Sequence, residues 1–224
     1  AILYCISAHS PPPMRLSAGT AMRCICISNR KKAKETPTAF RNMNNDILKI
    51  LVNQEEIDAV TTRLAKEIDR DYAGRSEHLV LLGILKGSLP FMAELMKKLT
   101  VNPEIEVMKV SSYGAGTKTS GSIHIILDWM RPNIEECDIV VIEDIIDSGR
   151  TLSYLCDYLK LKGAKSVRTC TLLDKPSRRE VDFTPDYCGV TVPDEFVVGF
   201  GLDYAEKYRA LPYIGVLKPE IYAK

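Results

Sequence analysis

Residues 140–152 have the sequence Val-Val-Ile-Glu-Asp-Ile-Ile-Asp-Ser-Gly-Arg-Thr-Leu, which joins an apolar run to three acids and a small-residue turn. The residues from Val140 to Ile142, continued by Ile145 and Ile146, predict a buried strand of a parallel sheet. Turn residues end this strand and leucines at helical spacing follow, so we expect a helix from Thr151. The stretch therefore predicts a strand that enters a helix through a tight turn.

This turn has the composition of an anion-binding site. A strand that enters a helix in this way directs several backbone N–H groups to one point. Ser148 and Thr151 add hydroxyl donors, and Gly149 lets the backbone approach a ligand closely. Glu143 and Asp144 fall at the carboxyl end of the strand, where open α/β sheets bind ligands. One end of the site therefore suits a phosphate, and the other suits sugar hydroxyls or a divalent cation.

The alternative for the same turn is purely structural, because acids, serine and glycine are common at the ends of helices. Two adjacent acids, a third acid and two hydroxyls within one turn favour a ligand site. The stretch lacks the spacing of a Walker loop, and no Gly-x-Gly-x-x-Gly follows a predicted strand.

Length and composition indicate one soluble globular domain. The chain has 224 residues, of which 46% are apolar and 26% charged, so it can bury a sizeable core. Residues 1–42 carry seven basic residues and one acid, whereas residues 43–224 carry 23 basic and 28 acidic residues. The net charge of −5 on the second part argues against a nucleic-acid binder. No apolar run approaches the roughly 20 residues of a membrane span.

The seven cysteines are scattered along the chain. Cys156 and Cys170 fall in apolar segments, which favours buried thiols in a reducing compartment over a disulfide framework. Cys24 and Cys26 lack the spacing and second pair of a zinc site. We expect a cytoplasmic protein.

The first 42 residues are rich in Pro, Ser and Arg, and we expect a disordered extension there. An organelle-targeting segment, an upstream reading-frame artefact and a cloning remnant remain open for this extension. We expect the folded domain to comprise residues 43–224.

The remaining pattern alternates strands and helices. Asn53 and Glu56 form a capping box that predicts a helix from residue 53. Strands are expected at 78–85, 105–110, 123–128, 139–143, 166–173 and 196–199, with helices at 88–99 and 151–161. This order predicts an α/β fold, a mostly parallel sheet with helices on both faces.

Four further segments have residues suited to a site. A strand ends and a helix begins at Leu85-Lys86-Gly87-Ser88, which predicts a second anion-binding turn. The alternative is that Lys86 is a solvated loop lysine. The polar loop 111–122 is either a linker or an active-site lid. Lys175 in Leu-Leu-Asp-Lys-Pro follows a strand, with a surface lysine as the alternative. Residues 193–209 have the sequence PDEFVVGFGLDYAEKYR and combine a phenylalanine in a strand with Asp203 and Arg209. The structural alternatives are a core ring for Phe196, a helix cap for Asp203 and a surface side chain for Arg209.

Together these segments carry a resemblance to a known family. Residues 140–152 resemble the phosphoribosyl pyrophosphate (PRPP) motif of type I phosphoribosyltransferases. With the other four segments, the chain from about Met43 to Lys224 resembles the bacterial-type hypoxanthine (guanine) phosphoribosyltransferases. Ser148 and Arg150 depart from the commoner Thr and Lys but keep hydrogen-bond donors. The resemblance implies the type I phosphoribosyltransferase fold, with a small hood from the segment after Met43 and from about 177–195.

The resemblance also implies roles for the motif residues. Asp147 is the expected general base for the purine N7 proton and also lies in the PRPP cradle. PRPP and nucleotide would be bound by Glu143, Asp144, Asp147, Ser148, Gly149, Arg150 and Thr151. Mg²⁺ would be held, partly through water or ribose, by Glu143, Asp144 and Asp203.

The resemblance assigns the other ends of the substrates as well. Pyrophosphate would be bound by Leu85, Lys86, Gly87 and Arg209, with a cis peptide between Leu85 and Lys86. Ser112 and Tyr113 would belong to a mobile loop that closes over PRPP and excludes water. The purine would be bound by Lys175 (to O6), Phe196 (stacking), Val197 (backbone) and Asp203. A lysine ammonium only donates hydrogen bonds, so it suits a 6-oxo group and penalises the 6-amino group of adenine.

The implied activity is purine salvage, in which the 5-phosphoribosyl group of PRPP moves to N9 of hypoxanthine or guanine with release of pyrophosphate. We expect a homodimer or homotetramer with no nucleic-acid or membrane partner. A non-catalytic RNA-binding regulator on the same fold and an orotate- or uracil-specific transferase are the alternatives. The sequence leaves open the choice among hypoxanthine, guanine and xanthine.

Overall fold

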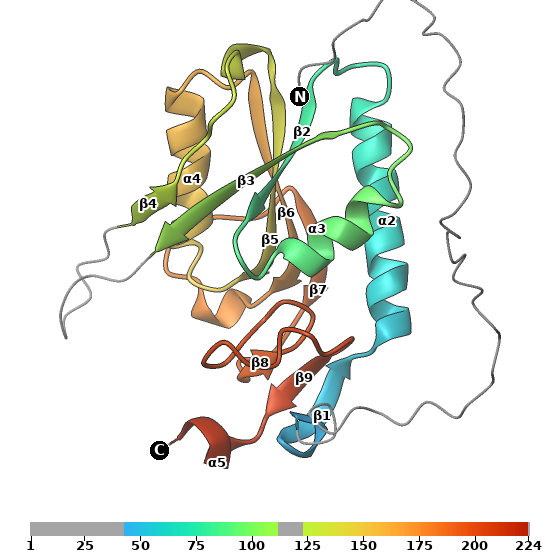
Figure 1. The fold of residues 1–224 in the computed structure, drawn as a ribbon, viewed down its shortest axis with the longest axis vertical. Coiled ribbons are helices and arrows are strands. Elements are labelled where there is room, and N and C mark those ends of the chain that lie inside the picture. Colours follow the sequence, from blue (N-terminus) through green and yellow to red (C-terminus); the bar gives the residue numbers. More distant parts are fainter. Residues whose placement is uncertain (1–42, 112–122, 224) are drawn as a thin grey trace, which may run out of the picture. The chain divides into compact units, whose positions relative to one another are not determined.

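The computed structural model describes residues 43–111 and 123–223, all within the compact unit Thr36–Lys224. Two sheets carry the fold (Figure 1). The strands are β1 (Ile47–Val52), β2 (Leu79–Ile84), β3 (Glu104–Ser111), β4 (His124–Leu127), β5 (Asp138–Ile146), β6 (Ser166–Asp174), β7 (Tyr187–Thr191), β8 (Val197–Val198) and β9 (Ile214–Leu217). The helices are α2 (Gln54–Tyr72), α3 (Leu89–Met96), α4 (Arg150–Leu161) and α5 (Pro219–Tyr222), with 3₁₀ turns at Ile134–Glu136 and Pro176–Arg178.

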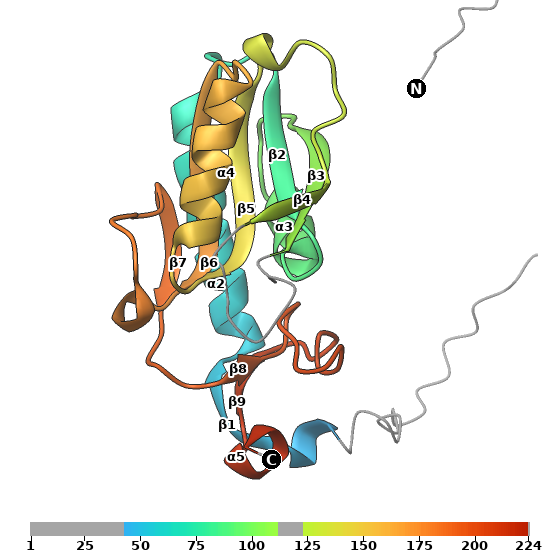
Figure 2. The same cartoon turned by 90° about the vertical axis from the view of Figure 1, so that its left-hand side faces the viewer.

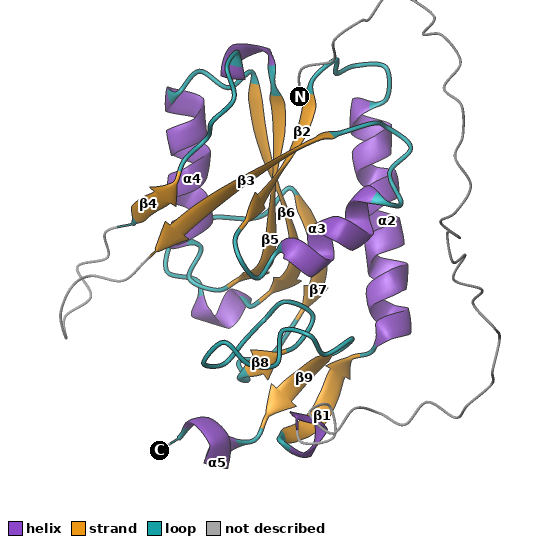
Figure 3. Cartoon of the chain, viewed as in Figure 1, coloured by secondary structure: helices purple, strands orange, loops and turns teal. Residues whose placement is uncertain are grey.

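The larger sheet has the order β4-β3-β2-β5-β6-β7 (Figure 3). Its neighbours pair in parallel from β3 to β7, and β4 pairs antiparallel at one edge. The central strands β2 and β5 have almost continuous apolar runs because both of their faces are covered. The predicted mostly parallel sheet is therefore confirmed.

Helices cover both faces of this sheet (Figure 2). Successive residues of a strand point to opposite faces. On β2, Leu79 and Leu81 therefore join α2 and α3 in one core cluster, whereas Val80 and Leu82 join α4 in another. The two clusters fix the sheet between its helices and leave the carboxyl ends of its strands available for a site.

The start of α2 follows the predicted capping box. Asn53 Oδ1 accepts a hydrogen bond from Glu56 N at 2.9 Å, and Asn53 N donates to Glu56 Oε2 at 2.8 Å. Two exposed backbone donors of the first turn are satisfied in this way, so the helix begins where the sequence indicates.

A smaller sheet has the order β1-β9-β8 and all of its pairs are antiparallel. The sequence pattern predicted neither β1 nor β9. It also assigned residues 177–195 to the hood, whereas β7 within that range pairs with β6 in the larger sheet. The second part of the small sheet comes instead from β8 and β9. Here "hood" denotes β1, β8, β9 and α5.

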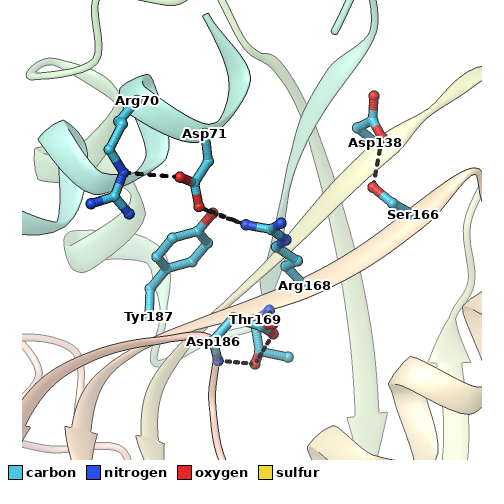
Figure 4. A network of polar contacts seen from close by, with 8 residues as sticks. All are labelled: Arg70, Asp71, Asp138, Ser166, Arg168, Thr169, Asp186 and Tyr187. Carbon is cyan, nitrogen blue, oxygen red and sulfur yellow. Dashed lines mark hydrogen bonds and ion pairs between the residues drawn. The ribbon is translucent and has the colours of Figure 1, made fainter. Parts of the chain in front are cut away.

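Polar networks tie the amino ends of the larger sheet together (Figure 4). Asp71, at the end of α2, accepts hydrogen bonds from Arg168 on β6 at 2.6 Å and from Tyr187 on β7 at 2.9 Å. Asp138, the first residue of β5, accepts from Ser166 at 2.6 Å and Lys165 at 2.9 Å. These contacts lie at the end of the sheet opposite to the predicted site, so we assign them to stability.

Within residues 43–111 and 123–223, no helix has the length and apolar character needed to cross a bilayer.

Candidate active site

The turn between β5 and α4 forms an open cradle. Helix α4 begins after Gly149, which has φ of 81° and supplies no side-chain cap. Gly149 has no side chain that could bond to the N–H groups at the start of the helix, and Arg150 N donates a long hydrogen bond of 3.4 Å to Ser148 Oγ. Asp147 is not the N-cap of this helix, because Gly149 has that position. A small cavity of about 100 Å³ lies over the turn and is lined by Glu143, Ile145, Ile146, Asp147, Ser148, Gly149, Thr151 and Leu152.

Glu143 and Asp144 lie side by side near the end of β5. Burial raises the pKa of Asp144 to about 6, against the opposing effects of the Ile145 N–H, which donates to Asp144 Oδ1 at 2.7 Å, and of Arg209. Burial and then the neighbouring Asp144 raise the pKa of Glu143 well above its ordinary value. Glu143 Oε2 is buried without a hydrogen-bond partner. Burial therefore outweighs the nearby Arg209 charge and the Ile145 N–H, so both carboxyl groups favour the protonated form more than an exposed carboxyl group does.

The predicted pyrophosphate loop packs directly against this acidic pair. The Leu85–Lys86 peptide bond is cis, as the sequence resemblance implied. A Cβ at Gly87 would lie 1.6 Å from Asp144 Oδ2, and a Cβ at Gly201 would lie 1.9 Å from Gly87 O. Only glycine fits at Gly87 because the carboxylate occupies the space of a side chain. The structure thus brings together three segments that the sequence separates by more than fifty residues.

Charged side chains surround this junction. Arg209 Nη2 lies 2.7 Å from Asp203 Oδ1, and Arg209 Nη1 donates to Gly201 O at 2.7 Å. Lys86 Nζ lies 3.1 Å from Glu206 Oε1. Lys86 and Arg209, both expected at pyrophosphate, are therefore held by the carboxylates of one turn. Arg209 is not the surface arginine of the structural alternative, because its side chain is only 27% exposed.

A larger pocket of about 420 Å³ lies between the carboxyl end of the large sheet and the hood. Its walls include Ile145, which is partly buried against the core, and Phe196, which is 36% exposed. The full lining is Ile145, Asp147, Lys175, Arg178, Asp194, Glu195, Phe196, Val197, Leu202 and Tyr222. Five of these ten residues are charged and the others are mainly apolar or aromatic, so the pocket offers both apolar contact and polar groups to a small molecule.

Lys175 and Val197 supply the polar groups expected for a purine. Lys175 is 7% exposed and its Nζ donates to Glu195 O at 2.9 Å, so it is not the surface lysine of the alternative. Val197 lies in β8, the edge strand of the small sheet. Leu217 N donates to Phe196 O at 2.8 Å, so Phe196 directs its carbonyl to β9 and Val197 directs its backbone groups away from β9. An edge strand has such unpaired groups available for a ligand.

The structure adds charged residues that the sequence analysis did not select. Arg178 Nε lies 3.0 Å from Asp147 Oδ1, and Arg178 Nη1 lies 3.5 Å from Asp194 Oδ1. The Asp147 contact is an ion pair without hydrogen-bond geometry, so Oδ1 keeps its capacity to accept a hydrogen bond. The only signal in the sequence was the position of Arg178 in the loop after Lys175, which was insufficient to distinguish it from Arg179.

Ser112 and Tyr113 lie outside the described residues. In the described part of the chain, no three His, Cys, Asp or Glu side chains form a cluster able to hold a metal ion by themselves. The other predicted site residues lie in the described structure, but Arg150 lines neither cavity and its side chain pairs with Glu180.

Comparison with known proteins identifies the family. The phosphoribosyl transferase domain matches residues 48–205. The chain belongs to the phosphoribosyltransferase family. Hypoxanthine-guanine phosphoribosyltransferase of Streptococcus mutans is 52% identical over 182 residues, which are 81% of this chain and 99% of that phosphoribosyltransferase.

Two other relatives support this assignment. The bifunctional protein TilS/HprT of Listeria monocytogenes is 52% identical over 183 residues, or 82% of this chain, and the match spans only 28% of that longer protein. A crystal structure of hypoxanthine phosphoribosyltransferase from Staphylococcus aureus has a TM-score of 0.76 and 44% identity, and covers 82% of this chain and 98% of that one. The type I phosphoribosyltransferase fold predicted from the sequence is therefore confirmed.

Proposed function

We propose that this phosphoribosyltransferase transfers the 5-phosphoribosyl group of PRPP to N9 of hypoxanthine or guanine and releases pyrophosphate. One observation carries the proposal: the larger pocket and the small cavity over the turn share Ile145 and Asp147 as lining residues. A base bound in the larger pocket and a phosphate bound in the small cavity would therefore place the sugar between them. The similarity to proteins named hypoxanthine-guanine phosphoribosyltransferase supports the substrate class.

The larger pocket would recognise the base through stacking and through its polar edge. The purine would stack on Phe196, and the Val197 backbone would pair with its Watson–Crick edge. The Lys175 ammonium would donate to O6 of a 6-oxopurine. The same ammonium would disfavour binding of adenine, because its 6-amino group is also a hydrogen-bond donor.

Asp147 would accept the purine N7 proton while N9 attacks the ribose. Its carboxylate lines both cavities, which is the position required of a base that acts between the purine and PRPP. Arg178 pairs with this carboxylate. Proton transfer to Asp147 neutralises it as the bond to C1′ forms.

PRPP would be bound by the turn and by the junction beside it. The 5′-phosphate would take the backbone N–H groups and hydroxyls of Ser148–Thr151. Glu143 and Asp144 would accept hydrogen bonds from the ribose 2′- and 3′-hydroxyls. Lys86 and Arg209 would exchange their present carboxylate partners for pyrophosphate oxygens, a bidentate role that suits a guanidinium.

Mg²⁺ fits the same end of the site. It is bound in proteins by one or two carboxylates together with waters and substrate phosphates. The buried Glu143 Oε2, which lacks a hydrogen-bond partner, the buried Asp144 carboxylate and the partly buried Asp203 carboxylate supply such oxygen ligands. When bound, the ion would stabilise the negative charge that develops on the leaving pyrophosphate.

We also propose a cytoplasmic homodimer or homotetramer. The four cysteines of the described residues are free, and Cys137, Cys156 and Cys170 are buried, which fits a reducing compartment. Leu89 and Met96 on α3 are 43% and 42% exposed and supply apolar surface for self-association. Light scattering on purified protein measures the oligomeric state directly.

The activity is tested with hypoxanthine, guanine, xanthine and adenine in the presence of PRPP and Mg²⁺, followed by absorbance. We expect turnover of hypoxanthine or guanine, dependent on both PRPP and Mg²⁺, while adenine is a much poorer substrate. Tight PRPP or nucleotide binding without turnover of any base would contradict the proposal and would favour a regulator on the same fold.

A further inference from the structure

The ring of Phe196 packs against two tyrosines of the hood region. Tyr222, on α5, stacks on it with ring centroids 4.7 Å apart and planes 20° apart. Tyr204 meets it edge-on, with centroids 5.6 Å apart and planes 88° apart. Both geometries are favourable for aromatic pairs. The ring that we assign to base stacking is therefore itself held by two other rings.

Hydrogen bonds of Leu217 and Lys218 fix the start of α5, the helix that carries Tyr222. Leu217 N donates to Phe196 O at 2.8 Å, so the strand before α5 is bonded to the residue whose ring Tyr222 contacts. Lys218 N donates to Asp46 O at 2.9 Å, and Lys218 Nζ donates to Asn45 O at 2.6 Å. α5 thus starts from a point bonded both to the Phe196 backbone and to the segment before β1.

We propose that Tyr222 is a positioning residue for the purine, because it holds the Phe196 ring in the orientation that stacks on the base; this inference rests on the proposed function. A phenylalanine ring that is 36% exposed has rotameric freedom that it loses when a base stacks on it. The Tyr222 ring restricts that freedom before the base arrives. Preorganisation of this kind increases affinity because the ordering cost of binding is reduced.

The inference predicts a specific kinetic pattern. Tyr222 also lines the larger pocket but is absent from the lining of the small cavity over the phosphate turn. Loss of its ring should therefore weaken base binding and leave PRPP binding unchanged. The energy of one aromatic pair corresponds to a rise in KM for the base of about twofold to tenfold.

The test compares three variants in the full-length chain. Tyr222→Ala removes the stacked ring, whereas Tyr222→Phe keeps it. Tyr154→Ala is the matched control, because Tyr154 also stacks on an aromatic ring, Tyr158, with centroids 6.1 Å apart, and lines neither cavity. For each protein we would measure kcat, KM for hypoxanthine or guanine, KM for PRPP, and the calorimetric Kd for inosine 5′-monophosphate.

We expect Tyr222→Ala to raise KM for the base by about twofold to tenfold with unchanged KM for PRPP, and Tyr222→Phe and Tyr154→Ala to behave as the wild type. An unchanged KM for the base in Tyr222→Ala would overturn the inference. A lower KM would also overturn it, because Tyr222 would then occupy the place of the base. An unchanged KM for PRPP verifies that the variant is folded.

Failure of the proposed function has a different signature. A wild-type protein that turns over no base refutes the activity, and the nucleotide titration then still reports on Tyr222. In that case, equal Kd values for wild type and Tyr222→Ala overturn the positioning role, whereas weaker binding by the variant supports it.

Discussion

Lys175→Met removes the ammonium group to which we assign recognition of the 6-oxo group, while it keeps a side chain of similar length. Lys175 is 7% exposed, and its Nζ donates to Glu195 O at 2.9 Å and lies 3.8 Å from Asp194 Oδ1. An ammonium has three N–H donors, so the Glu195 contact leaves donors for the base. Methionine leaves the base O6 without a partner in a largely buried site.

The expected loss of activity follows from the charge on the Lys175 donor. A hydrogen bond to a charged group contributes about 1.5–3 kcal/mol, so kcat/KM for hypoxanthine should fall by about 10-fold to 150-fold. Adenine has no 6-oxo group, so Lys175→Met removes no hydrogen bond to it. The substitution also removes the ammonium that is unfavourable for the 6-amino group of adenine. The ratio of kcat/KM for hypoxanthine over adenine should therefore fall by at least about tenfold.

The assay measures initial rates with hypoxanthine, guanine and adenine at saturating PRPP, together with KM for PRPP. Lys97→Met is the matched control, because Lys97 is 61% exposed and pairs with Glu94 on the surface of α3. An equal fall in kcat/KM for hypoxanthine and adenine would refute the reasoning, since general damage to the pocket does not distinguish the bases. Unchanged purine kinetics would refute it as well.

Three other substitutions test the remaining parts of the site and the fold. Asp147→Asn removes the proton acceptor, so we expect kcat to fall by about 10²-fold to 10⁴-fold while PRPP affinity, measured by calorimetry, changes little. Gly87→Ala would place a carbon 1.6 Å from Asp144 Oδ2, so we expect KM for PRPP to rise by about tenfold. Asp138→Asn should lower the free energy of unfolding at pH 7 by about 1–3 kcal/mol in urea titrations. This difference from the wild type should shrink as the pH falls below 3.8.

The sign of the pH effect follows from the surroundings of Asp138. Burial raises the pKa of Asp138, but hydrogen bonds from Ser166, Lys165 and Ser76 outweigh it and leave the pKa below the ordinary value of 3.8. Its folded-state pKa is therefore lower than its unfolded-state pKa. The carboxylate contributes stability above the unfolded value, and this contribution is lost as the pH falls through the folded value. Equal unfolding free energies of variant and wild type at pH 7 would contradict this assignment.

Other results would contradict the predictions for Asp147→Asn and Gly87→Ala. A large loss of PRPP affinity in Asp147→Asn would make Asp147 a structural residue of the cradle. Gly163→Ala is the control for Gly87→Ala, because nothing lies within 4 Å of a Cβ at Gly163. If both glycine variants changed KM for PRPP equally, the contact between Gly87 and Asp144 would not explain the effect.

The local parts of the fold and site were predictable from the sequence. The stretch from Val140 to Leu152 indicated a strand, a turn and a helix, and the structure has β5 and α4 there. The capping box at Asn53 was equally predictable. Both signals are local, because backbone pairing, caps and the anion-binding turn involve residues that are close together in the chain.

The small sheet was not predictable in the same way. β1 exposes Leu48 and Ile50, at 57% and 55%, so it has no clean alternation of buried and exposed residues. It is a strand because it pairs with β9, about 165 residues away, with Ile47 opposite Leu217. A strand whose partner is so distant acquires its conformation from pairing in the folded protein, and its own sequence carries little of that information.

The sequence by itself determined the family, the central strands and the residue types of the phosphate turn. Only the tertiary structure decided which side chains meet: Gly87 with Asp144, Arg178 with Asp147, and Tyr222 with Phe196. Periodicity and turn residues determine the conformation of a segment from its neighbours in the chain. Contacts between segments depend instead on strand register and core packing, which involve the whole domain at once.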